Sequence, residues 1–374
     1  MLPLYVDGCK GNRRAVLPLT PVEAVLNYTA YMKVEVIDYD LPRHLIAQEP
    51  APERDASRLM VCRREGGAPQ HRSFADFPSY LRSGDVLVVN DSSVYPARLR
   101  GLLDDAEGEL LLLRKLAPGR YRALARPARR APVGARFVFG TDGLHAEVVG
   151  VLAGPERVVE FYGAEDVEAA IDAGGTVPLP PYIKRPGGPD ARDAERYQTV
   201  YARRRGSVAA PTAGLHFTRA MLEGIRGAGV NVVEVTLHVS YGTFKPIRAE
   251  TFEEHDMEKE EVSISRSAAR ALSAAKLEGR RVVAVGTTSV RAVETAANEA
   301  GVVAPFRGET GLFIYPGYQF KAVDAVLTNF HLPRSSLLAL VGAFAGVQNV
   351  QGWYRAAVAE GYRFYSYGDA MFVY

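Results

Sequence analysis

The sequence predicts an α/β protein whose main domain is interrupted by a small all-β insert. From Tyr197 onward, apolar segments of strand length alternate with segments of helical period, which is typical of α/β folds. In residues 98–163, short strand candidates recur at close spacing between Gly and Pro residues, as in a small antiparallel barrel. The length of 374 residues favours two domains. We expect a barrel-like α/β body from residues 32–97 and 164–374, with residues 98–163 forming an inserted antiparallel β-barrel.

The composition excludes several classes of protein. With 47% hydrophobic and 24% charged residues and a net charge of +2, the chain is an ordinary globular protein, and any nucleic-acid-binding surface must be local. The two cysteines, Cys9 and Cys62, form no CxxC motif, which argues for a reducing compartment and against structural zinc. No apolar run approaches the length of a membrane span. We therefore expect a cytoplasmic protein that binds neither a metal nor a membrane.

The N-terminal segment, residues 1–31, lacks a clean hydrophobic period. It contains Arg13-Arg14 but no apolar core of signal-peptide length after them. We expect Met32 to be the natural start, with residues 1–31 an extension that is not native; the alternative is a docked N-terminal element. Residues Val34–Ile37 then predict a strand.

The remaining elements follow in order. A buried strand is predicted at Val86–Val89, where an apolar run ends in polar residues. A short helix is expected at Ala164–Ala173, ended by two glycines, and a proline-rich loop follows at Val177–Pro186. The expected strands of the insert are Leu110–Leu113, Tyr121–Leu124, Arg136–Phe139, Leu144–Val151 and Arg157–Phe161. In the C-terminal half, we expect helices at 219–226, 267–278, 288–299 and 334–344, and strands at 230–239, 281–285, 312–315 and 324–328.

Two stretches share a chemistry that a self-contained core does not need. Residues 206–218 and 235–244 each join an apolar run to small, hydroxyl and imidazole side chains, including His216 and His238. Glycine permits close approach of the backbone to a ligand, and hydroxyl and imidazole groups supply donors and acceptors. The alternative is a pair of tight turns with satisfied core histidines. The repetition of the pattern favours a binding site.

Two further segments join a predicted strand to a helix. Residues 282–291 pass through Gly286-Thr287-Thr288-Ser289, so free amides at the helix start could bind a carboxylate or phosphate. Residues 328–336 carry Asn329 and His331, which lie at the same edge of the sheet if the strands are parallel. A capped βα turn is the alternative for the first segment, and an Asx turn with an N-cap at Ser335 for the second.

Three charged or aromatic segments have two interpretations each. Residues 362–371 carry four aromatic rings with Arg363 and Asp369; they could stack a base, or form a C-terminal edge strand. His255 lies in an acidic cluster that could hold a general base or simply be solvated. Residues 114–136 contain cations but no Asp or Glu, which favours a phosphate-binding surface over a solvated positive face. The cations are Arg114, Lys115, Arg120, Arg122, Arg126, Arg129, Arg130 and Arg136, and Lys184-Arg185 and Arg203–Arg205 add to them.

Together, several of these segments resemble one known family. The residues that carry the resemblance are Tyr39–Pro42, Leu45–Gln48, Arg54–Leu59, Val89–Asp91, Pro96–Leu99, Pro178–Arg185, Tyr197–Tyr201, Ala209–Phe217, Val285–Arg291, Thr328–Ser335 and Tyr362–Met371. They are similar to the S-adenosylmethionine:tRNA ribosyltransferase-isomerases of queuosine biosynthesis, over the chain from Val34 to the C-terminus. The resemblance implies an α/β-barrel-like body with an inserted small β-barrel.

The resemblance also implies the reaction. The ribosyl part of S-adenosylmethionine, a co-substrate rather than a permanently bound cofactor, is transferred to 7-aminomethyl-7-deazaguanine at the tRNA wobble position. Epoxyqueuosine-tRNA forms, and adenine and methionine are released. The expected partner is a tRNA with a GUN anticodon, and the enzyme is expected to be a monomer. The sulfonium acidifies the ribose C5′ proton, so a base must be positioned to accept it.

This chemistry assigns expected roles to residues. We expect His216 and His238 to transfer protons, with Asp369 or Glu260 behind them. Thr287, Thr288, Ser289 and Arg291 could bind the carboxylate of methionine, and Arg363, Tyr365 and Tyr367 could line a pocket for the wobble base. The other expected substrate-binding residues are Asn90, Asp91, Thr212, Thr243, Asn329 and His331. The expected tRNA-binding residues are Arg126, Arg129, Arg130, Lys184 and Arg185.

Three positions depart from the family's pattern. Ser93 stands where the family usually has Arg after Asn-Asp-Thr, Ser240-Tyr241 replaces a Gly-containing pair, and Glu258 stands where His is expected. The first and third change the charge near the expected site. One alternative function is therefore a non-catalytic relative that only binds tRNA. Another alternative is an α/β enzyme that binds a small anion at residues 286–289, but this function gives the basic insert no role.

Overall fold

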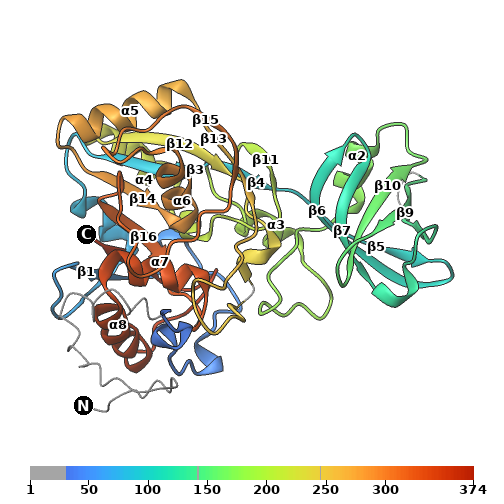
Figure 1. Cartoon of the computed structure of the whole chain (residues 1–374), viewed down its shortest axis with the longest axis horizontal. Helices are drawn as coiled ribbons and strands as arrows, with labels where there is room; N and C mark the ends of the chain where they lie inside the picture. Colours follow the sequence, from blue (N-terminus) through green and yellow to red (C-terminus); the bar gives the residue numbers. More distant parts are fainter. Residues whose placement is uncertain (1–30, 141–142, 245) are drawn as a thin grey trace, which may run out of the picture.

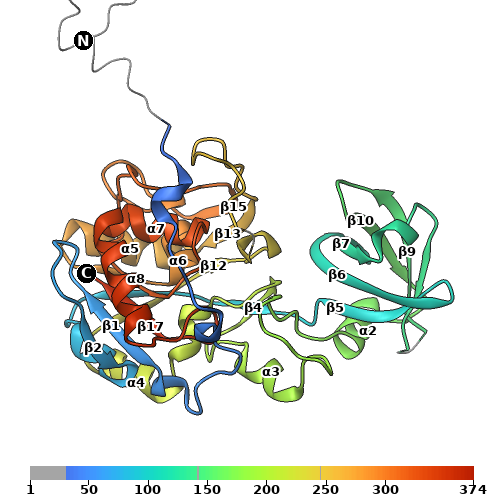
Figure 2. The same ribbon diagram turned by 90° about the horizontal axis from the view of Figure 1, so that it is seen from below.

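The computed structural model describes residues 31–140, 143–244 and 246–374, and these form two lobes (Figures 1 and 2). The larger lobe is an α/β body, and the smaller lobe is a closed antiparallel barrel that stands to one side of it. The barrel strands occupy Arg98–Tyr162, in the middle of the chain. The prediction of an α/β body with an inserted antiparallel barrel is confirmed. Closure is confined to the insert, because the sheet of the body has two edge strands, β15 and β2, among the described strands.

A nine-stranded mixed sheet organises the body. Its order is β15-β13-β12-β3-β14-β16-β17-β1-β2. The strands are β1 (Arg58–Cys62), β2 (Gln70–Ser73), β3 (Val86–Asn90), β12 (Asn231–Leu237), β13 (Glu260–Ile264), β14 (Val282–Val285), β15 (Phe306–Thr310), β16 (Ala325–Asn329) and β17 (Ala370–Val373). The neighbours β12, β3, β14 and β16 run parallel to one another. Their carboxyl ends therefore meet at one edge of the sheet, where ligands bind in open α/β folds.

Both faces of this sheet are covered, which explains its continuous apolar strands. In β3, Val86 and Val88 belong to one core cluster, whereas Leu87 and Val89 belong to another on the opposite face. All four side chains are almost completely buried. Strands buried on both faces read as unbroken apolar runs because side chains alternate between the faces. The helices are α2 (Val167–Gly174), α3 (Ala191–Arg196), α4 (Arg219–Gly227), α5 (Arg266–Leu277), α6 (Gly286–Ala296), α7 (Ser336–Ala345) and α8 (Val347–Ala359).

The inserted barrel closes in the order β10-β7-β6-β5-β8-β9. Its strands are β5 (Arg98–Leu103), β6 (Ala106–Ala117), β7 (Arg120–Arg126), β8 (Arg136–Val138), β9 (His145–Val151) and β10 (Glu156–Tyr162). Leu110, Leu112 and Phe137 are fully buried inside it and form a core separate from those of the body. The five predicted strands of the insert are confirmed, and β5 is an additional one.

Short elements lie around the body and between the lobes. The strands β4 (Ser92–Val94) and β11 (Arg204–Ser207) form a small parallel sheet that continues from the end of β3. The 3-10 helices are η1 (Val34–Ile37), η2 (Arg43–Leu45), η3 (Arg54–Ala56), η4 (Phe74–Tyr80), η5 (Ala128–Arg130), η6 (Thr212–His216) and η7 (Tyr241–Phe244).

Two predicted strands are wrong. Val34–Ile37 is the 3-10 helix η1, in which Val34 and Ile37 are buried. Their separation of three residues places both on the same face of a 3-10 turn. Residues 312–315 are irregular, and the nearby strand is β15, which ends at Thr310. There the Thr310 hydroxyl accepts a hydrogen bond from the Leu312 amide at 3.1 Å, a local bond that competes with a strand ladder.

Two features at the C-terminus also differ from expectation. Helix α8 was not predicted. The edge-strand alternative for residues 362–371 is wrong, because β17 lies inside the sheet between β16 and β1. The other predicted helices and strands of the C-terminal half are confirmed as α4 to α7 and as β12, β14 and β16. Residues 1–30, the subject of the prediction about the start of the chain, lie outside the described residues.

No described helix is both long and apolar enough to cross a membrane. Within the same residues, no group of three or more His, Cys, Asp and Glu side chains is placed to hold a metal ion.

Candidate active site

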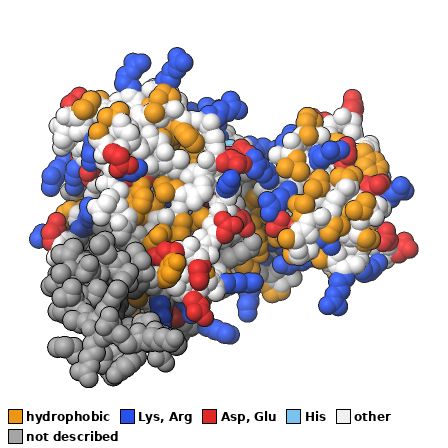
Figure 3. Space-filling view, in the orientation of Figure 1, with side chains coloured by type: hydrophobic (Ala, Val, Ile, Leu, Met, Phe, Trp, Pro, Cys, Tyr) orange, Lys and Arg blue, Asp and Glu red, His pale blue; other side chains and the backbone are white. Residues whose placement is uncertain are grey.

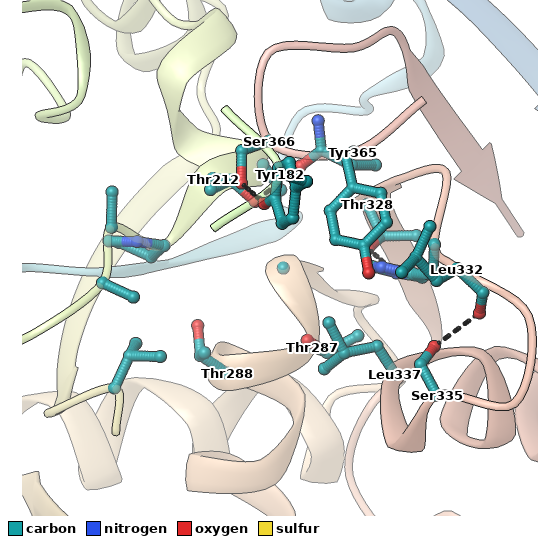
Figure 4. A pocket seen from close by; sticks show the side chains of 18 of the residues that line it. Tyr182, Thr212, Thr287, Thr288, Thr328, Leu332, Ser335, Leu337, Tyr365 and Ser366 are labelled. Atoms are coloured by element: carbon teal, nitrogen blue, oxygen red, sulfur yellow. Dashed lines mark hydrogen bonds between the residues drawn. The ribbon is translucent and has the colours of Figure 1, made fainter. Parts of the chain in front are cut away.

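A pocket lies at the carboxyl edge of the sheet, beside the ends of β14 and β16 (Figure 4). About 710 Å³ of space lies inside it, including space that is open to solvent. The walls come from the loop before η6, the start of α6, the segment after β16 and the C-terminal turn. The polar residues that line it are Tyr182, Thr212, Thr287, Thr288, Thr328, Asn329, His331, Ser335, Tyr365 and Ser366.

The start of helix α6 forms one wall. Gly286, Thr287 and Thr288 line the pocket, and no side chain in the described part of the chain caps this helix. Gly286 has a φ of +83°, a conformation that glycine adopts without strain. The Thr288 hydroxyl is buried and has no hydrogen-bond partner among the described residues. An uncapped helix start and an unpartnered buried hydroxyl are the kinds of donor that bind anions in proteins.

The opposite side of the pocket is aromatic (Figure 4). The rings of Tyr182 and Tyr365 lie with their centroids 3.9 Å apart, and the hydroxyl oxygens of Tyr182 and Ser366 are 2.5 Å apart. Tyr365 has a φ of +74°, which is rare for a bulky residue and is found mainly at functional sites. The turn that holds it is tied down by Asp369, whose carboxylate accepts the amides of Arg58 at 2.9 Å and Arg363 at 2.8 Å.

His216 lies behind the pocket wall and is bonded through both ring nitrogens. The Asn329 amide donates to Nε2 at 3.1 Å, so Nδ1 carries the proton and donates to the Ser57 hydroxyl at 2.8 Å. The Thr212 hydroxyl in turn donates to the Asn329 carbonyl at 2.9 Å. Burial, helped by the nearby cations Arg363 and Arg54, lowers the pKa of His216 to about 3. This neutral histidine therefore orients Asn329, which does line the pocket.

His331 has a similar environment. It lines the pocket, and its Nε2 lies 2.8 Å from the Thr328 hydroxyl. Burial lowers its pKa to about 3, so it too is neutral near pH 7. Its backbone amide donates to the Tyr354 hydroxyl at 3.0 Å, which fixes the segment after β16.

His238 lies at a second site, after the end of β12. It lines a cleft of about 1500 Å³ between the barrel and the body, whose walls also carry Lys115, Arg122, Glu258 and Glu260. Val239 lines both this cleft and the first pocket, so the two cavities are neighbours. In the sheet, β3 separates β12 from β14, and this places His238 on the barrel side of the edge.

Arg291 and Glu260 are brought together, but away from the first pocket. They form a buried ion pair, and the Glu260 carboxylate also accepts the Ser240 amide at 2.7 Å. The Arg291 side chain donates to the Leu312 carbonyl at 2.9 Å. Arg291 lies one turn beyond Thr287 and Thr288 on the same face of α6, but its guanidinium is held by Glu260 and the Leu312 carbonyl and does not line the pocket. Truncating one member of a buried pair costs about 3–5 kcal/mol, which indicates a structural role.

Several other expected site residues lie outside the pocket and stabilise its frame. Asn90 holds β3 to β12 through the amide and carbonyl of Leu237. Asp91 accepts a hydrogen bond from Thr236 at 2.6 Å. Ser289 donates to the Val285 carbonyl at 2.7 Å. Two more expected residues also lie elsewhere: Arg363 donates to the Tyr367 carbonyl, and Tyr367 is buried against Tyr197. The side chain of Thr243 lies outside the described residues.

The cations of residues 114–136 are largely paired, which corrects the reason given for a phosphate-binding surface. Their carboxylate partners come from other strands or from α2: Arg114 with Glu261 and Glu309, Lys115 with Glu168, Arg120 with Glu160, Arg122 with Glu156, and Arg136 with Glu147. On the face shown in Figure 3, basic and acidic side chains are interspersed over the barrel.

The unpaired cations are fewer. Arg129 and Arg130 are exposed on η5 and have no carboxylate partner among the described residues. Arg126 is exposed, and its guanidinium approaches the Glu109 carboxylate no closer than 3.9 Å. Lys184 is also exposed, whereas Arg185 is half-buried in a two-point ion pair with Asp193. Arg185 therefore stabilises the proline loop.

Comparison with known proteins decides the family. The family described as "Queuosine biosynthesis protein" matches residues 34–373. The chain belongs to this family. Among curated queuosine biosynthesis proteins, the chain is 51% identical over 345 residues to the S-adenosylmethionine:tRNA ribosyltransferase-isomerase of Moorella thermoacetica. It is 50% identical over 348 residues to that of Symbiobacterium thermophilum. Each match covers 91% of this chain and 100% of the relative.

A solved structure matches over the same share of the chain. The crystal structure of the S-adenosylmethionine tRNA ribosyltransferase from Thermotoga maritima is 37% identical in sequence, with a TM-score of 0.50. The match covers 91% of this chain and 100% of that chain.

The three departures from the queuosine biosynthesis pattern are now placed. Glu258 lines the cleft, and a Cβ atom added to Gly242 would lie 2.3 Å from its carboxylate, so the two are in close contact. Ser240 and Tyr241 line the same cleft. The Ser93 hydroxyl accepts from Gln198 at 3.1 Å. Glu258 and the pair Ser240-Tyr241 therefore lie beside His238 rather than in the first pocket.

Several residues at both sites have no distinguishing signal in the sequence. Tyr182 and Ser366 line the pocket and lie in segments that carry the family resemblance, but neither is among the predicted site residues. Ser57 and Ser92, which bond the two histidines, were missed as well. Serine has no sequence signature that separates these positions from ordinary turn residues. Their partners lie more than 100 residues away in sequence.

Proposed function

We propose that the chain transfers the ribosyl part of S-adenosylmethionine to 7-aminomethyl-7-deazaguanine at the wobble position of tRNA, and releases adenine and methionine. Such a transferase-isomerase acts in queuosine biosynthesis. The observation that carries the proposal is the pocket of Figure 4, because all its walls come from segments inside the matched region 34–373. In it, an uncapped helix start faces aromatic rings across the cavity.

The two ends of the pocket suit the two ends of S-adenosylmethionine. The carboxylate of its methionine part binds at the start of α6, where the amides and the Thr287 and Thr288 hydroxyls are donors. The flat adenine and its ribose lie toward Tyr182 and Tyr365, where aromatic faces supply stacking area. Asn329, oriented by His216 and Thr212, offers its second amide hydrogen to the nucleoside.

The tRNA binds across the two lobes. The cleft that contains His238 lies between the barrel and the body, next to the first pocket, so a wobble base inserted there meets the ribose of S-adenosylmethionine. Exposed cations Arg126, Arg129, Arg130 and Lys184 contact the phosphates. The substrate is a tRNA with a GUN anticodon, the working form is a monomer, and the reaction takes place in the cytoplasm.

One incubation tests this function. The purified protein is mixed with S-adenosylmethionine and tRNA that carries either 7-aminomethyl-7-deazaguanine or unmodified guanine, and free adenine is measured. We expect adenine only with the modified tRNA and S-adenosylmethionine together. Salt-sensitive tRNA binding without adenine formation would instead identify a non-catalytic tRNA-binding relative.

A further inference from the structure

Two buried serines lie behind His238 on the side away from the cleft. The Ser92 hydroxyl oxygen is 2.7 Å from His238 Nδ1 and 2.5 Å from the Ser207 hydroxyl oxygen. The Ser207 oxygen also accepts the backbone amide of Val239 at 2.9 Å. Both serines are completely buried. They come from β4 and β11, which pair in parallel, so the relay is built into a strand ladder rather than a loose loop.

The imidazole ring has little freedom to turn. A Cβ atom placed on Gly206 would lie 2.6 Å from the ring of His238, so the glycine backbone packs directly against the ring. Any larger residue at position 206 would collide with the ring, which explains why glycine is found there. With Nδ1 bonded to Ser92, Nε2 is the ring nitrogen available to a ligand in the cleft.

The directions of the hydrogen bonds in this relay can be assigned by counting protons. Among the described residues, the Ser207 hydroxyl has no partner other than Ser92 and the Val239 amide. The amide must donate, so the only acceptor for the Ser207 proton is the Ser92 oxygen. The Ser92 proton is then donated to His238 Nδ1. In the reverse direction, with Nδ1 protonated, one serine proton would be buried without an acceptor, which native structures avoid.

We infer that the Ser207–Ser92 relay holds His238 as the neutral Nε2–H tautomer, and that this N–H donates a hydrogen bond to the 6-carbonyl oxygen of the wobble base in the cleft. The inference rests on the proposed function for the identity of the base, but not for the tautomer. A guanine-type edge offers one carbonyl acceptor and two N–H donors. A donor histidine that lines the cleft complements the carbonyl acceptor of that edge.

This assignment changes the role expected of His238. A proton-accepting histidine must present an unprotonated nitrogen to its substrate. Here the unprotonated nitrogen is Nδ1, which is bonded to Ser92 inside the protein. His238 therefore acts as a fixed donor that orients the base, and Ser92 and Ser207 are positioning residues.

The tautomer is tested without any substrate. Long-range ¹H–¹⁵N NMR of ¹⁵N-histidine-labelled protein distinguishes the protonated from the unprotonated ring nitrogen, and His238→Gln assigns the signal. We expect Nε2–H for His238. The same spectrum contains a control, since His216 should be the opposite tautomer, with Nδ1–H. Ser92→Ala should move His238 toward a mixture, and Ser92→Thr should restore Nε2–H. An Nδ1–H or protonated His238 at pH 7.5 in the unaltered protein overturns the inference, whatever the catalytic result.

The donor role is tested with two substitutions at one position. Glutamine places an amide N–H near the position of Nε2 but cannot accept a proton, whereas alanine removes the donor. We expect His238→Ala to lower kcat/KM for tRNA by about 100-fold and His238→Gln by less than about 10-fold, the range measured for single fixed donors. If the two variants are equally impaired, His238 is a base and the inference fails.

Binding measurements identify the ligand. His238→Ala should weaken binding of the modified tRNA by about 5- to 10-fold, as for one lost hydrogen bond, and leave the Kd for S-adenosylmethionine unchanged. A weakened S-adenosylmethionine complex with unchanged tRNA binding would place adenine, not the wobble base, at His238 and overturn the choice of ligand. Absence of adenine release in the unaltered protein would reject the proposed function while leaving the tautomer result intact.

Discussion

One histidine, His216, lies behind the wall of the pocket beside α6, and another, His238, lines the cleft beside the barrel. Each has a serine at Nδ1, yet the two are in opposite tautomeric states. At His216, the Asn329 amide donates to Nε2, so Nδ1 carries the proton. At His238, the Ser207–Ser92 relay donates to Nδ1, so Nε2 carries it. The first ring is bonded through both nitrogens, and the second leaves one nitrogen for a ligand. Histidines in similar local sequences therefore differ in which ring nitrogen is protonated, because their hydrogen-bond partners are distant in the chain.

The largest effect is expected at Asn329, whose side chain lines the pocket and is hydrogen-bonded to His216. Asn329→Ala removes the amide that lines the pocket and also leaves His216 Nε2 without its donor. We expect adenine release to fall by about 100- to 1000-fold, as when a fixed polar group is removed from an active site. Single-turnover assays measure it, and circular dichroism checks the fold. A folded variant with wild-type turnover would show that this amide does not act on the substrate.

The second prediction concerns the pH dependence of stability, to which the buried histidines His216 and His331 contribute. The pKa of His216 and of His331 is about 3 in the folded protein, against about 6.5 for an unfolded histidine. The unfolded state therefore binds more protons between these values, and stability is lost as the pH falls below about 6.5. From pH 6.5 to 5, each histidine should lower the free energy of unfolding by about 2 kcal/mol.

Urea denaturation at several pH values measures this slope. In His216→Gln, the contribution of one histidine is absent, so the loss of stability between pH 6.5 and 5 should shrink by about 2 kcal/mol whatever the absolute stability of the variant. Ser289→Ala, which changes no titrating group, should keep the original slope. An unchanged slope in His216→Gln would mean that His216 is protonated in the folded state.

A smaller effect is expected at the start of α6, and it affects binding only. Thr288→Val keeps the shape of the side chain and removes the unpartnered hydroxyl. We expect the Kd for S-adenosylmethionine to rise by about 5- to 10-fold, equivalent to one hydrogen bond, with little change in kcat. The matched control is Ser289→Ala, since the Ser289 hydroxyl bonds the Val285 carbonyl within the helix. Isothermal titration compares the two variants, and equal effects would argue against an anion site at Thr288.

The smallest effect is expected for cations on the barrel surface, where variants at unpaired and at paired cations can be compared for tRNA affinity. The double variant Arg129→Gln/Arg130→Gln removes two exposed cations without carboxylate partners in the described chain. We expect tRNA affinity to fall by several-fold at low salt and the slope of log K against log salt to decrease by about 1–2. Arg120→Gln/Arg122→Gln, whose guanidiniums are paired with Glu160 and Glu156, should change both by less. Equal losses would mean that the ion pairs open on binding.

Much of the fold follows from local pattern in the sequence. The alternation of apolar runs and helical segments after Tyr197, and the close spacing of short strands between 98 and 163, are properties of neighbouring residues, and both predictions are confirmed. The unbroken apolar run of β3 likewise predicts a strand buried on both faces. The errors at Val34–Ile37 and 312–315 occurred in short segments, where a local hydrogen bond or packing on a helix decides the conformation.

The sequence by itself also determined the family, because its motifs are long, and it marked Thr288 and Asn329 as residues at strand ends. Only the tertiary structure decided which residues face a ligand. Arg291, Arg114 and Arg122 are paired with carboxylates from other strands, and the Asp369 carboxylate accepts two backbone amides. Charge and hydrogen bonding depend on distances in space, and the chain brings together groups that are separated by up to about three hundred residues. For that reason the state of each histidine is a property of the assembled sheet edge, and not of the motif that contains it.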